Sequence, residues 1–550
     1  MGVGFIMEPH NDGVSPLITR YKTLLELIET TFDKYAALSA YSCMGHTLTF
    51  AEVDRLSALF ARYLQHGLGL QAGDRIAVQL PNILQFPVVL YGAMRAGLVV
   101  VNANPLYTSR EIKYQLCDSG AKALVVLSNI AANASEIIRD TQVETVIVTD
   151  IADLHPQPKR LIINAVVKHL KKMVPAYSFP NTVSLRDALA NTYPEVALAD
   201  VSPYDLAVLQ YTGGTTGVSK GAVLTHRNLA ENVWQVVSHM ESAFDEGKET
   251  FVACLPLYHI YALNLHALGA FSRGAHNILI PNPRDLAALV KEIKRHRMTI
   301  FIGINTLFNA LCRFSAFQKM DFSSLKLTTS GGMALTEDAA KSWIAVTGND
   351  ICEGYGLTET SPVVCGNQAG GIQRGTIGLP VPETELKVID DDGNRLPNGE
   401  AGELCVRGPQ VMQGYWNNPV ETAKVLSVDG WLKTGDIAVI NDDGYVKIVD
   451  RKKDMILVSG FNVYPNEVED IATQMPEILE AAAVGVADEC SGEVVKLFVV
   501  RVDSTLTEEA VKAFCRQNLT GYKAPKYVEF RDALPKSNVG KILRKELRDS

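Results

Sequence analysis

The chain has 550 residues, 47% of them hydrophobic, and a formal net charge of −9. This length exceeds what one hydrophobic core supports, so we expect two or more domains. The acidic balance argues against nucleic acid as a partner, because nucleic-acid-binding domains are normally basic.

The nine cysteines form no CxxC pair and no zinc-ligand spacing, which is typical of buried thiols in a reducing compartment. The first residues lack the basic and apolar regions of a signal peptide. The most apolar window, 86–101, contains Arg95 and is too short to span a bilayer. We therefore expect a cytoplasmic protein that is at most peripheral at the inner face of the membrane.

The first two thirds of the chain alternate helical and strand patterns. Thr49 and Glu52 form a capping box, and apolar residues at helical spacing follow until Gly67. Strands are predicted at 75–80 and 123–127. Alternation of this kind favours an α/β fold with layered, largely parallel sheets in a large N-terminal domain.

A basic amphipathic segment follows at 159–174. Its apolar residues fall on one helical face, and Lys168, Lys171 and Lys172 cluster. We favour a solvated amphipathic helix packed on the body. The alternative is a weak peripheral contact with an anionic membrane.

A loop rich in Gly, Ser and Thr comes after the strand-like run 206–209 and ends in a lysine. It contains Thr212, Gly213, Gly214, Thr215, Thr216, Gly217, Val218, Ser219 and Lys220. Glycines let backbone N–H groups approach a ligand closely, and arrays of N–H groups with a cation bind phosphate. The register differs from the common P-loop, because Ser219 precedes the lysine. Composition alone also fits a flexible linker, but the strand-like lead-in favours a phosphate site.

Beyond Gly375 the pattern changes to short strands separated by turn clusters. The predicted strands are 383–389, 402–407 and 445–449. They indicate a small β-rich subdomain at about 375–450, at the end of an N-terminal domain of residues 1–450.

A compact α+β unit begins near Arg451, after which we expect a C-terminal domain of residues 451–550. Its predicted elements are helices at 467–475 and 507–519 and strands at 482–486 and 494–502. The short polar stretch 450–454 suits a connector between domains.

Six motifs occur in a fixed order along the chain. They are 211–220, 255–259, 353–359, 431–436, 450–454 and 535–541. Taken singly they would be ordinary loops, turns or solvated lysines. In this order they resemble the adenylate-forming superfamily of acyl-CoA synthetases, luciferases and peptide-synthetase adenylation domains. The segments most similar to the bacterial long-chain fatty acyl-CoA synthetases are 102–108, 305–311, 457–467 and 519–523.

The resemblance implies an enzyme that uses ATP and Mg²⁺. A long-chain fatty acid would attack the α-phosphate to give an acyl-adenylate and pyrophosphate, and coenzyme A would then displace AMP. The first step brings anions together, so it needs positive charge where negative charge develops. A stand-alone ligase that loads a carrier protein, a luciferase-like oxygenase and a non-enzymatic lipid-binding protein are the alternatives. Assembly as a homodimer is left open.

The resemblance also implies roles for single residues. Lys541 would stabilise charge during adenylation, and with an ordinary pKa near ~10.4 it would be protonated at neutral pH. Glu359 would hold Mg²⁺, which prefers carboxylate and phosphate oxygens, and Thr358 would bind the α-phosphate. His259 would lie beside the substrate carboxylate, either orienting it or guarding the acyl site.

Further roles concern the nucleotide and coenzyme A. Tyr355 would stack on adenine, and Asp436 would accept both ribose hydroxyls with help from Arg451. The other residues of the nucleotide site would be Gly331, Gly332, Gly354 and Gly356. Lys453 would be the hinge of a mobile C-terminal domain. The pantetheine channel would be lined by Ser459, Gly460 and Phe461.

The acyl site would lie among the apolar stretches 263–271 and 302–311. Plain core packing explains these residues equally well. Discrimination per methylene is only about 10- to 200-fold, so the sequence does not fix the preferred chain length.

Overall fold

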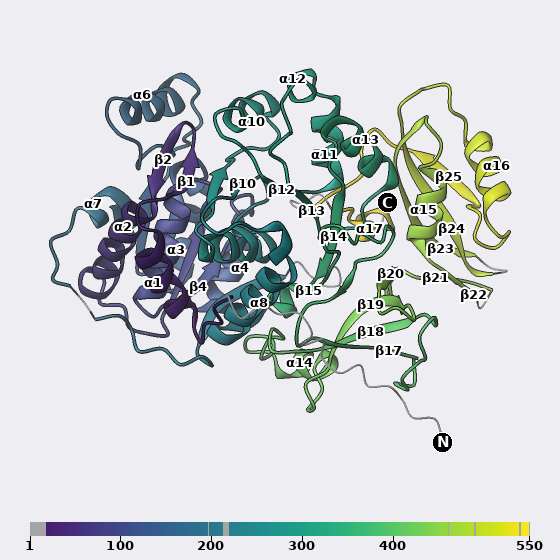
Figure 1. The fold of residues 1–550 in the computed structure, drawn as a ribbon, viewed down its shortest axis with the longest axis horizontal. Helices are drawn as coiled ribbons and strands as arrows, with labels where there is room; N and C mark the ends of the chain where they lie inside the picture. Colours follow the sequence, from purple (N-terminus) through teal and green to yellow (C-terminus); the bar gives the residue numbers. More distant parts are fainter. Residues whose placement is uncertain are drawn as a thin grey trace.

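Two large sheets, each with a parallel centre, carry most of the chain, and two smaller sheets follow them (Figure 1). The computed structural model describes residues 18–195, 197–212, 219–459, 461–488, 491–537 and 541–548. The α/β fold with a β-rich part and a small α+β part at the C-terminus confirms the predicted fold class.

The first large sheet has seven strands. Their spatial order is β7 (Thr182–Ser184), β6 (Thr145–Thr149), β5 (Ala123–Leu127), β3 (Arg75–Gln79), β4 (Val99–Asn102), β8 (Leu206–Thr212) and β9 (Lys220–Thr225). All neighbours are parallel except β8 and β9. The helices of this region are α1 (Leu24–Tyr35), α2 (Phe50–Arg62), α3 (Gln85–Arg95), α4 (Ser109–Ser119), α5 (Ala131–Ile137), α6 (Lys159–Ala165) and α7 (Leu185–Leu189).

The second large sheet has nine strands. Their order is β16 (Leu379–Pro380), β15 (Val363–Gly366), β14 (Ile351–Gly356), β13 (Leu327–Ser330), β12 (Ile300–Gly303), β10 (Thr250–Ala253), β11 (His276–Leu279), β1 (Ser39–Cys43) and β2 (His46–Thr49). Its helices are α8 (His226–His239), α9 (Ile260–Ala262), α10 (Leu286–Ile293), α11 (Asn305–Arg313), α12 (Ser315–Gln318) and α13 (Glu337–Thr347), with the π-helical segment η6 (Leu263–Ala270) after α9. The hairpin β1–β2 therefore joins a sheet whose other strands begin only at Thr250.

The two smaller sheets lie at the lower right and right of Figure 1. The antiparallel four-stranded sheet contains β17 (Glu385–Ile389), β18 (Gly402–Arg407), β19 (Leu432–Ile440) and β20 (Val446–Arg451), and α14 (Pro419–Val425) lies in its β18–β19 connection. The five-stranded sheet contains β22 (Phe461–Val463), β21 (Ile456–Val458), β24 (Gly492–Arg501), β23 (Ile478–Asp488) and β25 (Tyr527–Phe530). The helices α15 (Pro465–Ala472), α16 (Glu508–Asn518) and α17 (Arg544–Arg548) belong to it.

Helix α8 lies between the large sheets and the four-stranded sheet and carries a buried polar stripe. Asn228, Asn232, Gln235 and His239 recur at helical spacing and are all buried. They bond main-chain carbonyls at Pro409 and Val411, Val363, Pro382 and Gly366 respectively, over 2.7–2.9 Å. Because buried polar groups must find partners, this stripe fixes three backbone segments around one helix: strand β15, Pro382 and 409–411.

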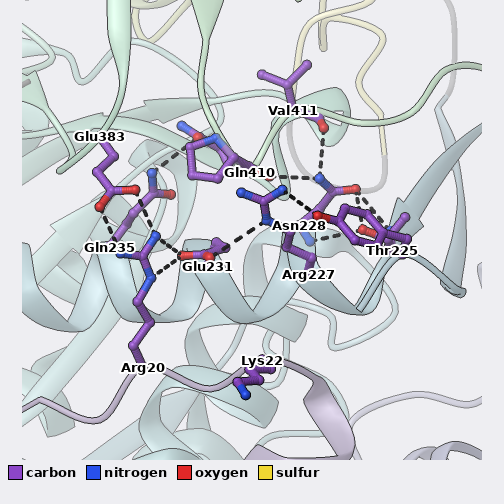
Figure 2. Close-up of polar contacts among 12 residues, drawn as sticks. Arg20, Lys22, Thr225, Arg227, Asn228, Glu231, Gln235, Glu383, Gln410 and Val411 are labelled. Atoms are coloured by element: carbon purple, nitrogen blue, oxygen red, sulfur yellow. Dashed lines mark hydrogen bonds and ion pairs between the residues drawn. The ribbon is translucent and has the colours of Figure 1, made fainter. Parts of the chain in front are cut away.

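A charged cluster lies next to this polar stripe, where the N-terminal segment meets α8 (Figure 2). Arg20 donates to Glu231 of α8 and to Glu383 before β17, each over 2.8 Å. Its guanidinium also lies 4.4 Å from the centre of the Trp234 ring. One arginine therefore joins the start of the described chain to α8 and to the β-rich part.

Candidate active site

One large cavity, of about 1060 Å³, opens where the large sheets, the four-stranded sheet and the C-terminal part meet. The predicted site residues that line it are Thr212, Lys220, His259, Gly331, Gly332, Gly354, Tyr355, Gly356, Thr358, Glu359, Arg451, Lys453 and Lys541. Five predicted residues of the glycine-rich loop, Gly213, Gly214, Thr215, Thr216 and Gly217, and also Gly460, lie outside the described residues.

Strand residues occupy both ends of the predicted loop 211–220. Strand β8 continues to Thr212 and β9 begins at Lys220, and these two residues are cross-strand neighbours. Ser219 Oγ donates to the Thr212 carbonyl over 2.5 Å. The hairpin therefore delivers the threonine hydroxyl and the lysine to the same edge of the cavity.

Close backbone packing forms one wall of the cavity after β14. A Cβ atom on Gly356 would lie 1.9 Å from the Pro362 carbonyl oxygen, and one on Gly331 would lie 2.9 Å from the Tyr261 ring. Glycine is thus required at 356 because backbone fills the space of a side chain. The packing brings the Tyr355 ring and the Thr358–Glu359 turn to the same wall.

Asp436 lies directly behind Tyr355. The Tyr355 hydroxyl donates to Asp436 Oδ2 over 2.5 Å, and Arg451 Nε lies 3.4 Å from Asp436 Oδ1. Strands β19 and β20 pair Asp436 with Arg451, and Gly435 before it has a φ of 72°, which glycine adopts at little cost. Burial, together with Asp436, raises the pKa of Tyr355 well above its usual value. The Tyr355 hydroxyl therefore keeps its proton and remains the donor of this hydrogen bond.

Tyr415 joins two predicted site residues, and nothing in the sequence pointed to it. Its hydroxyl donates to Glu359 Oε1 over 2.7 Å, and Lys220 Nζ lies 4.9 Å from the centre of its ring. The backbone of Glu359 is held as well, because Met412 N–H donates to its carbonyl over 2.8 Å. The carboxylate and the lysine are thereby fixed relative to each other.

His259 caps the short helix α9 and lies close enough to Lys541 to feel its charge. Its Nδ1 accepts from the Tyr261 N–H over 3.3 Å. Burial, with a further contribution from Lys541, lowers the pKa of His259 to about 4. The imidazole is therefore neutral at neutral pH and can offer hydrogen bonds without adding charge.

Lys541 lines the cavity, and its backbone is hydrogen-bonded to Ser537. Its N–H donates to Ser537 Oγ over 3.1 Å, and the Ser537 N–H donates to the Lys541 carbonyl over 2.7 Å. Burial, with Arg451 as the next cause, lowers the pKa of Lys541 to about 7. The ordinary lysine pKa assumed from the sequence is therefore wrong for Lys541 in this structure. The physical reason is desolvation among other cations.

Two of the predicted coenzyme A residues lie elsewhere. Ser459 and Phe461 are not among the residues lining the cavity. Phe461 is 57% exposed and stacks on Tyr522 with ring centres 4.9 Å apart. Lys453, by contrast, lines the cavity, and burial with Arg451 lowers its pKa to about 8. This conformation thus brings Lys541, and not Ser459 and Phe461, to the site.

The apolar part of the cavity is built from several elements, of which helix α8 contributes Val236. Its residues include Val236, Met240, Ala243, Leu255, Leu265, Ile304, Cys365 and Val381. Of the two predicted acyl stretches, 263–271 contributes only Leu265 and 302–311 only Ile304. The other residues of 263–271 are buried and do not line the cavity. The prediction therefore overestimated the share of this stretch in the acyl site.

The described residues contain neither a metal-binding cluster nor a membrane-spanning helix. Among them, no cluster of three or more His, Cys, Asp or Glu side chains could hold a metal ion. Within the same residues, every helix is too short or too polar to cross a bilayer.

Comparison with known proteins gives one consistent result. Residues 28–416 match the family described as AMP-binding enzyme, and residues 467–541 match its C-terminal domain. A long-chain-fatty-acid–CoA ligase of Escherichia coli O6:H1 (strain CFT073) is 52% identical over 96% of this chain and 95% of its own. The ligase of the same name from Bacillus subtilis (strain 168) is 37% identical over 99% and 97%.

Two solved structures have the same arrangement. The anthranilate CoA ligase AuaEII in complex with anthranoyl-AMP has a TM-score of 0.85 and 26% identity, covering 96% of this chain and 97% of its own. ATP-bound MatB from Rhodopseudomonas palustris has a TM-score of 0.79 and 29% identity, covering 96% and 98%.

Proposed function

The chain belongs to the family of AMP-binding enzymes, and from this premise we propose that it is a long-chain fatty acid–CoA ligase. It joins a fatty acid to AMP with release of pyrophosphate and then transfers the acyl group to the thiol of coenzyme A, releasing AMP. The observation that carries this proposal is a single cavity with two ends. One end gathers Lys541, Glu359 and Tyr355, whose hydroxyl donates to Asp436, and the other end is apolar.

In the adenylation step, the polar end binds the nucleotide. Asp436 accepts the ribose hydroxyls beside the Tyr355 ring, while Thr358 and Lys220 face the phosphates. Glu359 would hold Mg²⁺ together with phosphate oxygens, since a single carboxylate with a nucleotide suits this ion, and the ion would neutralise phosphate charge. Lys541 supplies an ammonium where negative charge is redistributed. His259 is neutral, so it orients the fatty acid carboxylate by hydrogen bonding without adding a charge beside it.

The apolar wall binds the fatty acid chain. Each buried methylene contributes about 0.8 kcal/mol, so a long chain binds through many small increments. Two wall residues directly follow stripe residues in the sequence: Val236 of α8 comes after Gln235, and Met240, the C-cap of α8, comes after His239. Binding energy from the chain thereby helps to hold the carboxylate at the reacting centre.

For the second step we propose that the C-terminal part, residues 451–550, rotates about Lys453. Lys541 lines the cavity in the present conformation, whereas Ser459 and Phe461 lie away from it. A rotation that withdraws Lys541 would bring this second face, with its exposed Phe461, towards the acyl-adenylate as the wall of the pantetheine channel.

The decisive experiment supplies ATP, Mg²⁺ and palmitate with and without coenzyme A and follows AMP and thioester. The proposal expects palmitoyl-CoA and AMP in equal amounts only when coenzyme A is present. Acyl-adenylate without thioester would favour a ligase that loads a carrier protein. An absence of any ATP turnover would point to a lipid-binding protein.

The lowered pKa of Lys541 gives a test of nucleotide binding. Before ATP binds, the amine of Lys541 is half protonated at a pH equal to its pKa of about 7. The negative phosphates of ATP favour the protonated form and therefore raise that pKa. At about pH 8, ATP binding should therefore take up a proton, and affinity should fall as the pH rises further. Calorimetry in buffers of different ionisation enthalpy measures the uptake. It should shrink in Lys541→Ala; an unchanged uptake would exclude this lysine as its source.

We further propose that this cytoplasmic enzyme docks on anionic membranes through the segment 159–173, which contains α6 and the π-helical turn η4 (Val166–Leu170). No residue of either helix is buried, and Figure 1 shows α6 at the upper left edge of the molecule, beyond β2. Leu161 is 61% exposed and Leu170 77%. This exposure weighs against the expected apolar packing of the helix on the body.

Assembly of the chain as a homodimer stays a prediction.

Polar contacts hold the segment and leave its apolar side chains outward. Asn164 accepts from the Ala152 N–H over 3.0 Å and donates to Asp153 over 3.1 Å. Asn129 donates to the Met173 carbonyl over 3.1 Å. Exposed Lys168, Lys171 and Lys172 surround the apolar residues. Apolar side chains in a basic frame on an acidic protein suit an anionic lipid surface.

Changing Lys168, Lys171 and Lys172 to Glu should abolish binding to vesicles that contain anionic lipid. Each lysine near such a surface contributes about 1 kcal/mol, so wild-type binding should be weak and should decrease with salt. Sedimentation with vesicles measures this binding. The matched control changes exposed Lys22, Lys319 and Lys341 to Glu and should bind like wild type. Equal binding by both triple variants would mean that the segment is only a solvated helix.

A further inference from the structure

Helix α14 places one carboxylate between two lysines at the polar end of the cavity. Glu421 Oε2 pairs with Lys220, and Glu421 Oε1 pairs with Lys424. All three side chains line the cavity, as does Tyr415, on whose ring Lys220 rests. Lys220, the residue proposed to face the phosphates, is thus paired with an anion of the protein itself.

The position of this carboxylate is set by backbone pairing. The Val223 N–H of β9 donates to the Gly414 carbonyl over 2.9 Å, and Trp416 N–H donates to the Gly221 carbonyl over 2.7 Å. The segment before α14 therefore runs alongside the strand that begins at Lys220. Asn418 then caps the helix by accepting from the Glu421 N–H over 3.1 Å.

A second contact fixes the first turn of α14. Thr422 Oγ1 accepts from the Tyr415 N–H over 2.8 Å and donates to the Asn418 carbonyl over 2.9 Å. The helix cap, the first-turn contact and the strand pairing all fix the position of this segment. Glu421 is therefore held opposite Lys220. Lys424 lies one turn further on the same helix face.

We propose that Glu421 is a counter-ion that the phosphates of ATP displace, and that Lys424 is a further phosphate-binding cation. This inference rests on the proposed ligase function. Without Glu421 the two ammonium groups would repel each other across the ligand-free site. When the triphosphate arrives, both lysines exchange the carboxylate for phosphate oxygens, and Glu421 remains as a like charge beside them.

Two consequences distinguish this arrangement from a passive surface ion pair. Glu421 weakens the binding of every phosphate ligand at this end, so it limits ATP affinity and also favours the departure of pyrophosphate. The two lysines lower the pKa of Glu421 to about 2, so the carboxylate stays ionised at neutral pH. Fatty acid and coenzyme A bind elsewhere and should not sense the change.

The test compares Glu421→Gln and Lys424→Gln with wild type. The dissociation constant of ATP and the inhibition constant of pyrophosphate should each fall by about fivefold in Glu421→Gln and rise by about fivefold in Lys424→Gln, as befits one partly exposed charge. Both effects should shrink at high salt. The KM for coenzyme A should not change. The matched controls are Glu337→Gln and Lys341→Gln, an exposed pair on α13.

Unchanged or weaker ATP binding in Glu421→Gln would overturn the counter-ion role, because it would mean that the carboxylate only positions Lys220. Unchanged binding in Lys424→Gln, a surface substitution that keeps the fold, would overturn the second part. Melting temperatures verify folding. If wild type makes no palmitoyl-CoA, the ligase proposal itself fails; if it does and the variants match it, only this inference fails.

Discussion

Replacing Lys541 with alanine is expected to slow adenylation by about 10²–10³-fold, the usual loss when a preorganised stabiliser of developing charge is removed. The thioester step should keep a rate near wild type, because it starts from an adenylate already made, after Lys541 has been withdrawn. Single-turnover assays measure each step, the second with supplied palmitoyl-adenylate and coenzyme A.

The matched control is Lys545→Ala, which removes an exposed lysine from α17 close in sequence and away from the cavity. It should leave both steps intact. Normal adenylation in Lys541→Ala, or an equal loss of both steps at an unchanged melting temperature, would contradict the role assigned to this residue.

Lys453→Pro is expected to reduce overall turnover by about 10²-fold, because displacement of a catalytic group by an ångström can cost that much. Proline fixes φ and constrains the residue before it, so the connector loses the freedom that rotation needs. The present conformation holds Lys541 at the cavity, so adenylation should survive and the thioester step should be lost. Separate assays of the half-reactions decide this.

Lys453→Ala serves as the control, because it removes the side chain that lines the cavity and leaves the backbone free. It should retain thioester formation. Equal loss of both half-reactions in a folded Lys453→Pro protein would argue against a rotating domain.

Local sequence signals predicted most single elements well. The capping box of Thr49 and Glu52 is present, with both hydrogen bonds, at the start of α2. The predicted strands 123–127 and 402–407 coincide with β5 and β18. The helix predicted at 467–475 ends earlier, at Ala472, because the following residues turn into β23. The same helix also begins before its predicted start, at Pro465, so short-range patterns leave both ends of an element uncertain by a few residues.

The site was less predictable because its properties depend on residues distant in sequence. The pKa of Lys541 is lowered by burial and by Arg451, which comes from another sheet. Tyr415 and Glu421 meet Lys220 only through pairing of their segment with β9. Most of the site residues that the motif order predicted, and that the structure describes, line the cavity, whereas such mutual contacts appear only once the chain is folded.

The hairpin β1–β2 has a consequence for synthesis of the protein. It belongs to the second large sheet, where Ser42 Oγ lies 2.7 Å from His276 Nε2, 234 residues further along the chain. Ribosomes add about 5–20 residues per second, so the hairpin waits about 12–47 s before its partner strand exists. During that time its buried residues, among them Tyr41 and Cys43, have no native neighbour on that side. Nascent chains halted before His276 should therefore bind chaperones through their first fifty residues, and chains halted after the second sheet is complete should not.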